Sequence, residues 1–538
     1  ENGVPFTGGT YFPPKELQGR PSFNSVLENV SKVYSENREK IISQVSQMQL
    51  VFKELNIKNS VLKQDLEPLA EKIIQYMDKD NGGFQGAPKF PQFYIFETLL
   101  YFYLKNKNIN FLNPVKNLLK NISAKGIYDH LDGGISRYTV DEKWIVPHFE
   151  KMLYDNILFV KILNIFVNYS KDDYFKNKLS QTINFINSDF KNKDNLLGSA
   201  YDADSEGVEG KFYTWKYEEL KNILDKDLEL LKKKYEITEN GNFEGLNIFV
   251  EKNNHQLTVY QYDKIKKIED KLKNIRDKRI KPFFDDKTQT DLNSYWIYSI
   301  LHSSFILNDK KLFDQANEYF NNLKKILSKN VFHCYNKDRK EIDVFLEDYS
   351  YFCLLLVSMY EIKNDKESIK LCSELMKYTW ENFYDEENVI LQKNIKTNND
   401  LFVKPIDIID NNIPNGNSIF LLVCNKLFNI TGDTFWEEKI INLKKSFHSF
   451  LNNSFSQMFS YIKIIDICEQ NLTITFHGNN EKLKQIKEIL IKDYFETATF
   501  IYKNNENESF VIVCKNQTCS EKLKDIEDVK KYLDEKLI

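Results

Sequence analysis

The chain has 538 residues, with 74 basic and 78 acidic side chains that give a formal net charge of −4. Its 42% hydrophobic and 28% charged residues exclude a wholly disordered chain, and the near balance of charge gives no drive toward nucleic acid. No run of about 18 apolar residues predicts a membrane-spanning helix. The length exceeds what one hydrophobic core usually organises, so we expect two or more domains or one large helical array.

The N-terminal segment is predicted to be a strand and turn over residues 1–14, followed by helical periodicity over 23–57. The first residues, ENGV, are typical of a hairpin turn, and they show neither the basic nor the apolar part of a signal peptide. Because a domain seldom starts at a hairpin turn, we expect the chain to begin inside its first domain.

A long array of helices is predicted from about residue 65 to 455. The predicted helices are 65–79, 91–106, 111–125, 147–169, 173–191, 217–235, 261–277, 290–307, 311–328, 346–362, 366–383, 415–429 and 433–452. Similar polar or glycine turns recur between them at intervals of about 46–60 residues. Helix pairs at this spacing form an open solenoid or a closed ring, and six pairs suit an (α/α)6 toroid with a central cavity.

A small α/β region is predicted after residue 455. Strand-like alternation covers 462–467, 472–476, 500–502 and 510–513, and helices are expected at 480–492 and 521–537. The seven cysteines are scattered, which fits buried thiols in a reducing cytoplasm. Cys514 and Cys519 form a C-x4-C pair, but without a second pair we expect no structural zinc site.

The densest polar constellation lies at residues 127–156. The polar and aromatic residues that it gathers are His130, Asp132, Arg137, Asp141, Trp144, His148, Glu150, Lys151 and Asp155. If a helix begins near Pro147, His148 and Asp155 fall on one face about 10 Å apart, a spacing that suits two sides of a bound ligand. The alternative is structural, with His148 bracing the helix and Asp155 paired with a neighbouring cation.

A second acidic cluster follows at residues 200–212. It contains Tyr201 and four carboxylates, Asp202, Asp204, Glu206 and Glu209. The start resembles a calcium loop, but its twelfth position is Tyr213 rather than glutamate, so the EF-hand interpretation fails. The carboxylates could bind hydroxyl groups or act as acid and base, or they could form an exposed acidic loop.

Two further acidic sites precede predicted helices. Asp286 comes shortly before the helix with Asn293, and Glu347 and Asp348 open a later helix. Acidic residues at these positions could equally favour the positive end of a helix.

Several motifs together resemble one family, the thioredoxin-domain proteins related to spermatogenesis-associated protein 20 and its bacterial YyaL-type relatives. The motifs are PFTGGTYFPP at 5–14, GGFQGAPKFP at 82–91, WIVPHFEKMLYDN at 144–156, YDADSEGVEGKFYTW at 201–215, DDK at 285–287, FLEDY at 345–349 and PNGNS at 414–418. They span nearly the whole chain in the family's order. The family's cysteine motif usually precedes the first of these segments, so we expect no redox motif here.

The resemblance implies a mainly α fold in three parts. A remnant of a thioredoxin-like domain is expected at 1–60, an (α/α)6 toroid similar to six-hairpin glycosidases and N-acylglucosamine 2-epimerases at 61–455, and a small α/β region at 456–538. It also implies a site in the central cavity. The expected catalytic residues are His148, Glu150, Asp202, Asp204, Asp286 and Glu347. The expected substrate-binding residues are His130, Arg137, Trp144, Asp155, Tyr201, Asn293 and Asp348.

The leading functional hypothesis is an epimerase-like or hydrolase-like toroid that acts on a saccharide without a metal or other cofactor. One alternative is a redox or protein-interaction module that binds a protein client. Another is a toroid that binds a ligand without turning it over. We expect a cytoplasmic protein with a small-molecule ligand and with neither nucleic acid nor membrane as a partner.

Overall fold

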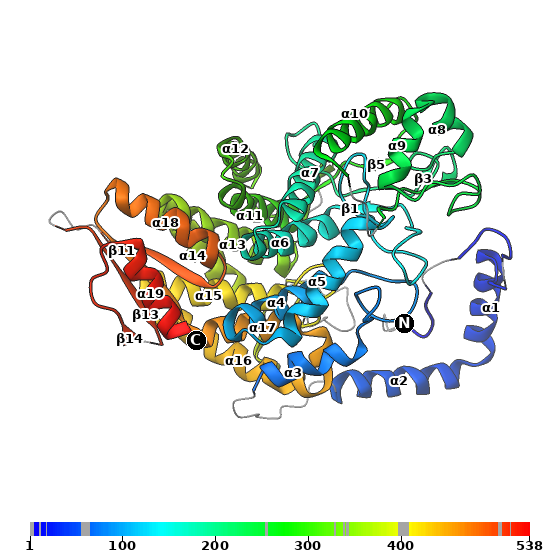
Figure 1. Ribbon diagram of the computed structural model, residues 1–538. Helices are drawn as coiled ribbons and strands as arrows, with labels where there is room; N and C mark the ends of the chain where they lie inside the picture. The colour runs from blue at the N-terminus through cyan, green and yellow to red at the C-terminus, as the bar shows by residue number, and fades with distance from the viewer. Residues whose placement is uncertain are drawn as a thin grey trace.

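The computed structural model describes residues 5–9, 12–17, 19–54, 65–252, 257–327, 330–336, 339–340, 344–395, 408–503, 508–516 and 518–537. Helices dominate these residues, and a small sheet lies near the C-terminus (Figure 1). None of the described helices is long and apolar enough to cross a membrane.

Six inner helices form a closed ring, which confirms the predicted (α/α)6 toroid. They are α4 (Phe93–Asn106), α6 (Leu153–Ser170), α11 (Thr290–Leu307), α13 (Leu346–Lys363), α15 (Gly416–Thr431) and α17 (Phe459–Gln470). Each packs against the next in this order, and α17 closes the ring against α4. Inner helices are buried almost all round, as in α13, where every residue from Leu346 to Ile362 is buried.

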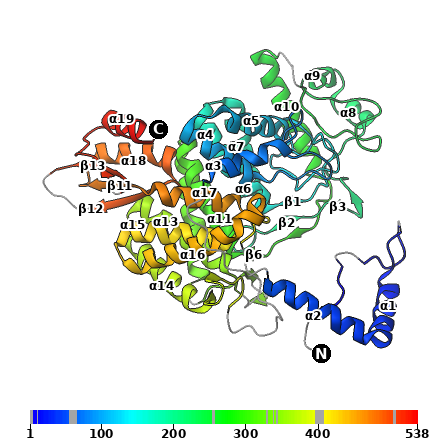
Figure 2. The same ribbon diagram turned by 90° about the horizontal axis from the view of Figure 1, so that it is seen from below.

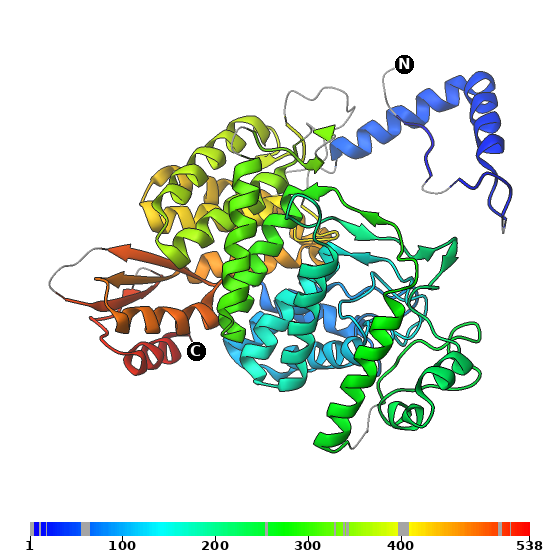
Figure 3. The ribbon, with the colours of Figure 1, turned by 90° about the horizontal axis from the view of Figure 1, so that it is seen from above.

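Outer helices surround this ring, and all but the first pack mainly against the inner helix that precedes them in sequence (Figure 3). The outer helices are α3 (Glu67–Lys72) with the 3-10 turn η1 (Ile73–Tyr76), α5 (Ile109–Ala124), α7 (Asp173–Asp189), α12 (Lys310–Ile326), α14 (Lys366–Phe383) and α16 (Thr434–Ser454). They are amphipathic: in α12, for example, Leu312, Ala316, Tyr319 and Leu323 form the buried stripe.

The inner helix predicted from residue 147 begins only at Leu153, so that prediction is wrong at its N-terminal end. Residues 147–152 are not helical. Pro147 bridges to Thr139, and β1 (Lys151–Met152) pairs with β2 (Ala200–Tyr201). His148 therefore does not share a helix face with Asp155.

The strand predicted over 462–467 is also wrong, because this segment lies inside α17. Its two polar residues gave the impression of alternation. Both are neutralised inside the ring: Lys463 contacts Glu97 and Glu496, and Asp466 accepts hydrogen bonds from Lys105. The ring is thus completed by a helix beyond residue 455, where the sequence placed the end of the toroid.

The C-terminal region has the predicted α/β character. Its sheet has the order β12 (Ala498–Lys503), β11 (Leu472–His477), β13 (Phe510–Lys515), β14 (Thr518–Cys519), with β11 and β12 parallel and α18 (Glu481–Tyr494) as their crossover. The last helix, α19 (Ile526–Leu537), packs on β13. Cys514 and Cys519 are paired across β13 and β14 in a disulfide bond, so the expectation of free thiols throughout is wrong for these two.

An insertion lies between α7 and α11 and carries its own small core. It contains β2, the hairpin β3 (Asp204–Ser205) and β4 (Val208–Glu209), and the helices α8 (Tyr217–Leu224), α9 (Asp227–Lys234) and α10 (Val259–Arg276). The helix predicted over 217–235 is split into α8 and α9 because Asp225 adopts a φ of 47°. The insertion ends at β5 (Phe284–Asp285), which pairs with β2.

The N-terminal arm projects away from the ring (Figures 1 and 2). It consists of α1 (Phe23–Glu36), capped by Ser22, and α2 (Arg38–Glu54). These helices confirm the periodicity predicted from residue 23, although residues 55–57 lie outside the described part. The described residues of the segment 1–14 form no strand, contrary to the prediction.

Three asparagines hold the loops that lead to the ring. Asn156 of α6, Asn293 of α11 and Asn417 of α15 each lie in the first turns of an inner helix. Each side chain accepts a hydrogen bond from one backbone N–H and donates to the carbonyl of the same residue, at Ile135, Leu197 and Leu391 respectively, with distances of 2.8–3.1 Å. This contact recurs at three of the polar or glycine turns that repeat along the sequence, and it fixes each turn against an inner helix.

Candidate active site

Carboxyl groups gather at the N-terminal ends of three consecutive inner helices. Asp155 lies in the first turn of α6, Asp291 in that of α11, and Glu347 and Asp348 in that of α13. The ring places these ends side by side, so carboxyl groups from segments that are distant in sequence face one region.

A cavity of about 310 Å³ opens at this end of the ring, and we call it the central cavity. Asp291, Glu347, Asp285, Tyr154 and Asn412 are among its lining residues. An adjoining lobe of about 70 Å³ shares Tyr154 and Asn412 with it. The volume falls in the range of small-molecule sites.

The smaller lobe is lined by Asp155, Arg137 and Phe90. Asp155 is 9% exposed, and its Oδ2 has no hydrogen-bond partner among the described residues. Burial raises the pKa of Asp155 well above its ordinary value, although the nearby Arg137 lowers it. Arg137 is partly exposed and forms an ion pair with Glu150 (3.2 Å). A buried oxygen without a partner beside a cation is suited to bind a hydroxyl group of a ligand.

At the wall of the 310 Å³ main lobe, Asp291 lies close to the buried Asp348 and the half-buried His333. The His333 Nδ1 lies 3.1 Å from Asp348 Oδ1, and Asp348 Oδ2 accepts the N–H of Phe345. Burial, reinforced by repulsion from Asp348, raises the pKa of Asp291 to about 7. Burial alone would lower the pKa of His333, but the hydrogen bond and charge of Asp348 outweigh it and raise the value to about 11.

The ligand atoms of these three residues lie within 4.8 Å of one another, close enough to surround a metal ion. Both imidazole nitrogens already have protein partners, however, because Nε2 of His333 lies 3.1 Å from Nε2 of Gln289. Contacts on both nitrogens make His333 poorly placed to bind a metal ion, and Asp291 is the member of the group whose pKa lies near neutral pH.

Two lysines bring positive charge to the main lobe. Lys393 forms an ion pair with Glu347 (3.0 Å), and Lys287 forms one with Asp285. These pairs hold both carboxylates at the cavity wall while leaving the lobe close to neutral.

Several residues expected at the cavity lie elsewhere. His148 is partly exposed and contacts Glu209 (2.8 Å), while Asp202 and Asp204 are exposed on the insertion. Asp286 is half-buried between two lining residues but does not line the cavity itself. These four do not converge with Glu347.

The other expected ligand-binding residues include four with structural contacts. Trp144 is fully buried and donates to the carbonyl of Asn81, and the Tyr201 hydroxyl donates to the carbonyl of Asp189. Asn293 holds the Leu197 loop, as described above. The His130 ring is buried and lies 3.2 Å from Glu251.

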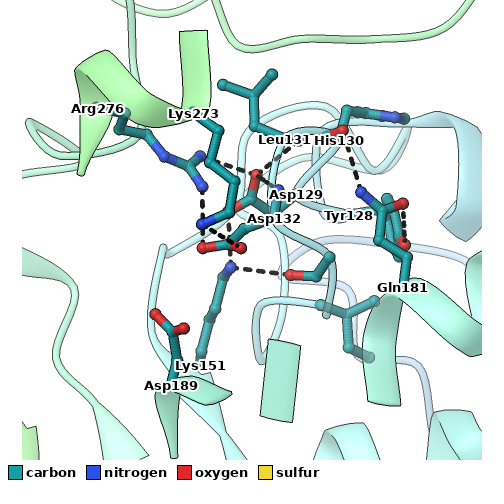
Figure 4. Close-up of polar contacts among 12 residues, drawn as sticks. Tyr128, Asp129, His130, Leu131, Asp132, Lys151, Gln181, Asp189, Lys273 and Arg276 are labelled. Atoms are coloured by element: carbon teal, nitrogen blue, oxygen red, sulfur yellow. Dashed lines mark hydrogen bonds and ion pairs between the residues drawn. The ribbon is translucent and has the colours of Figure 1, made fainter. Parts of the chain in front are cut away.

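The polar residues between 127 and 156 mainly form a network of buried ion pairs rather than a ligand pocket (Figure 4). Asp129 accepts hydrogen bonds from Lys151 and from Arg276 of α10, each at 2.8 Å. Burial would raise the pKa of Asp129, but these two cations lower it far below its usual range. Asp132 adds an ion pair with Lys273 (3.0 Å). The cluster ties the insertion to the ring.

Asp291 and His333 were missed by the sequence argument. Asp291 lies two residues before Asn293, and Asp155 lies directly before Asn156. An aspartate shortly before an asparagine at the start of an inner helix was therefore the signal in the sequence that could have identified Asp291. His333 lies immediately before β7 (Cys334–Asn336) and carried no such pattern.

Comparison with known proteins supports the predicted resemblance. Residues 1–53 match the family Thioredox_DsbH, described as a protein of unknown function, DUF255. Spermatogenesis-associated protein 20 of Rattus norvegicus is 25% identical over 505 residues, covering 82% of this chain and 64% of that protein. The human protein of the same name is 22% identical over 616 residues, covering 99% of this chain and 78% of that protein. The chain thus spans just under two thirds of the rat relative, and the predicted resemblance to the spermatogenesis-associated protein 20 family is confirmed over most of the chain.

Solved structures with a related arrangement have low identity. A D-mannose isomerase and the cellobiose 2-epimerase of Spirochaeta thermophila each give a TM-score of 0.47 at 10% identity, covering 71% and 72% of this chain and 84% of each of those chains. A GH76 α-mannanase of Bacteroides thetaiotaomicron gives 0.43 at 10% identity, covering 75% of this chain and 95% of that chain. These values carry no information on substrate or reaction.

Proposed function

We propose that this relative of the spermatogenesis-associated protein 20 family binds a saccharide in the central cavity and transforms it by carboxyl acid–base chemistry. The observation that carries the proposal is the placement of Asp155, Asp291 and Glu347 in the first turns of three neighbouring inner helices around one cavity. Acceptor-rich walls suit a ligand with many hydroxyl donors.

The roles follow from the environment of each group. Asp291, with a pKa of about 7, can give a proton to a leaving oxygen or take one from water near neutral pH. Glu347, paired with Lys393, can hold hydroxyl groups or stabilise positive charge. Asp155 and Arg137 in the adjoining lobe can bind further hydroxyl groups, and the ring of Phe90, 38% exposed, offers an apolar face beside them.

The lining favours the hydrolase-like form over the epimerase-like form. An epimerase would use a proton-transfer pair, for which histidines were expected. Among the described residues that line the central cavity there are several carboxyl groups and no histidine. Most glycoside hydrolases use a pair of carboxyl groups, one as the acid and the other as the base or nucleophile.

The test is a panel of mono- and oligosaccharides, with binding read by thermal shift and turnover by NMR of the sugar. Asp291→Asn is expected to abolish turnover and keep binding, and Glu347→Gln is expected to weaken both. Asp204→Asn is the matched control, since it removes an exposed carboxyl on the insertion. No sugar-dependent shift, or equal loss in Asp204→Asn, would refute the proposal, and binding without turnover in the wild type would leave a ligand-binding toroid.

Binding of a protein client is a second candidate, favoured by the N-terminal arm. Helix α1 has no buried residue, and Phe23 and Leu27 are 46% and 50% exposed. A dithiol reaction has no cysteine to use in residues 1–333. In an insulin-reduction assay the chain is expected to remain at background, whereas activity that disappears in Cys514→Ser would favour the redox alternative.

A further inference from the structure

A second cavity, of about 390 Å³, lies at the opposite end of the ring from the central cavity. Its walls come from α4, α6, α11 and α17 and from the segment 492–497, which comprises the end of α18 and its connection to β12. The C-terminal α/β region and the ring therefore build this cavity together.

The floor of this second cavity is charged but internally neutral. Lys161 lies 3.2 Å from both Glu97 and Glu496, and Lys463 contacts the same two carboxylates. All four residues line the cavity, and two cations are matched by two anions. A charged ligand would have to disrupt these pairs, so the floor disfavours one.

The walls above the floor are largely apolar and aromatic. Leu104, Ile165 and Leu472 line them, together with Phe495. The Phe495 ring is stacked on His302 with centroids 4.7 Å apart and an interplanar angle of 7°. Burial lowers the pKa of His302 to about 4, so this imidazole is neutral and extends the flat wall.

One polar group in the cavity lacks a partner. The hydroxyl of Tyr298 is buried, and no described residue forms a hydrogen bond with it. Tyr298 lines the cavity, and its ring lies 4.8 Å from that of Phe495. A buried hydroxyl without a partner is unfavourable, and an acceptor on a ligand would relieve that cost.

We propose that this second cavity binds a neutral, flat, mostly apolar small molecule that carries a hydrogen-bond acceptor for the Tyr298 hydroxyl. The aromatic walls select the flat apolar body, the closed ion-pair floor selects against charge, and the unpartnered hydroxyl selects the acceptor. The site is separate from the central cavity and does not depend on the proposed saccharide chemistry.

The experiment titrates Nile red, a neutral planar dye with a carbonyl acceptor, and follows its emission. The wild type is expected to show saturable binding at one site with blue-shifted emission. Ile165→Trp fills the cavity and is expected to abolish this signal, whereas Ile280→Trp, the same change at a residue that is 62% exposed, is expected to retain it.

Tyr298→Phe keeps the shape of the cavity and removes only the donor, so it is expected to fold normally and to bind about fivefold more weakly. Non-saturable binding, or wild-type affinity in both Ile165→Trp and Tyr298→Phe, would overturn the proposal. If the wild type bound the anionic dye anilinonaphthalene sulfonate but not Nile red, and Ile165→Trp lost that binding, the assignment to neutral ligands would be overturned.

Discussion

Replacing Asp291 with asparagine is expected to stabilise the protein in a pH-dependent manner. The carboxyl group is buried in the first turn of α11, and burial together with Asp348 raises its pKa to about 7. In the unfolded chain the pKa is about 3.9. Between these values the native state holds a proton that the unfolded state has lost, so stability falls as pH rises through this window.

The magnitude follows from the pKa difference. A pKa difference of about three units means that the ionised Asp291 destabilises the native state by about 4 kcal/mol at pH values well above 7. About 3 kcal/mol of this destabilisation develops between pH 5 and pH 8. With an unfolding entropy of about 2.1 cal/mol/K per residue over 538 residues, that change equals about 2–3 °C in Tm. Asparagine retains the oxygen that accepts the N–H of Leu292 (2.7 Å) and carries no charge.

The assay compares melting temperatures of Asp291→Asn and wild type at pH 5, 6, 7 and 8. The difference, variant minus wild type, is expected to increase by about 2–3 °C from pH 5 to pH 8. The exposed control Asp204→Asn is expected to stay within about 0.5 kcal/mol of the wild type. A difference that does not change with pH would show that Asp291 does not hold a proton near neutrality, and the acid–base role would lose its basis.

Three other substitutions test contacts that shape the molecule. Asn417→Ala removes both hydrogen bonds to the Leu391 backbone and is expected to cost about 2–3 kcal/mol in urea unfolding; an unchanged midpoint would contradict the loop-bracing role. Arg276→Met removes one of the two cations paired with Asp129 and is expected to lower the free energy of unfolding by about 3–5 kcal/mol. Proteolysis is then expected to cleave the insertion before the ring, and uniform cleavage would contradict the role of this ion pair in attaching the insertion to the ring. Glu496→Gln is expected to increase hydrogen exchange first in segment 492–497, and equal exchange in variant and wild type would contradict its role as an anchor.

Much of the fold was predictable because helical periodicity survives burial. Outer helices such as α12 keep an apolar stripe, and inner helices such as α11 stand out as long apolar stretches between turn residues. The failures have a common cause. Polar residues that find buried partners, such as Lys463 in α17, imitate the alternation of a strand when their partners are not known.

The candidate site was only partly predictable, for a similar reason. The clustering of polar residues in sequence drew attention to segments 127–156 and 200–212. The first segment, however, mainly forms a network of buried ion pairs, and the second contains an exposed hairpin. The ring instead gathers residues from separate repeats. Glu347 and Asp155 were identified as motif residues, whereas Asp291 becomes noticeable only when α6, α11 and α13 are aligned at their N-terminal ends.

The pKa shifts of Asp155 and Asp291 run against the direction expected from helix capping alone. The N-terminal ends of helices carry partial positive charge, which stabilises carboxylates and lowers their pKa. Carboxyl groups placed at these ends only for stability would follow that direction. At Asp155 and Asp291 burial outweighs it and raises the pKa, so both groups destabilise the fold in their ionised form. Perturbed pKa values cluster at functional sites, so these two shifts, together with the cavity that both groups line, support the acid–base role proposed for the central cavity.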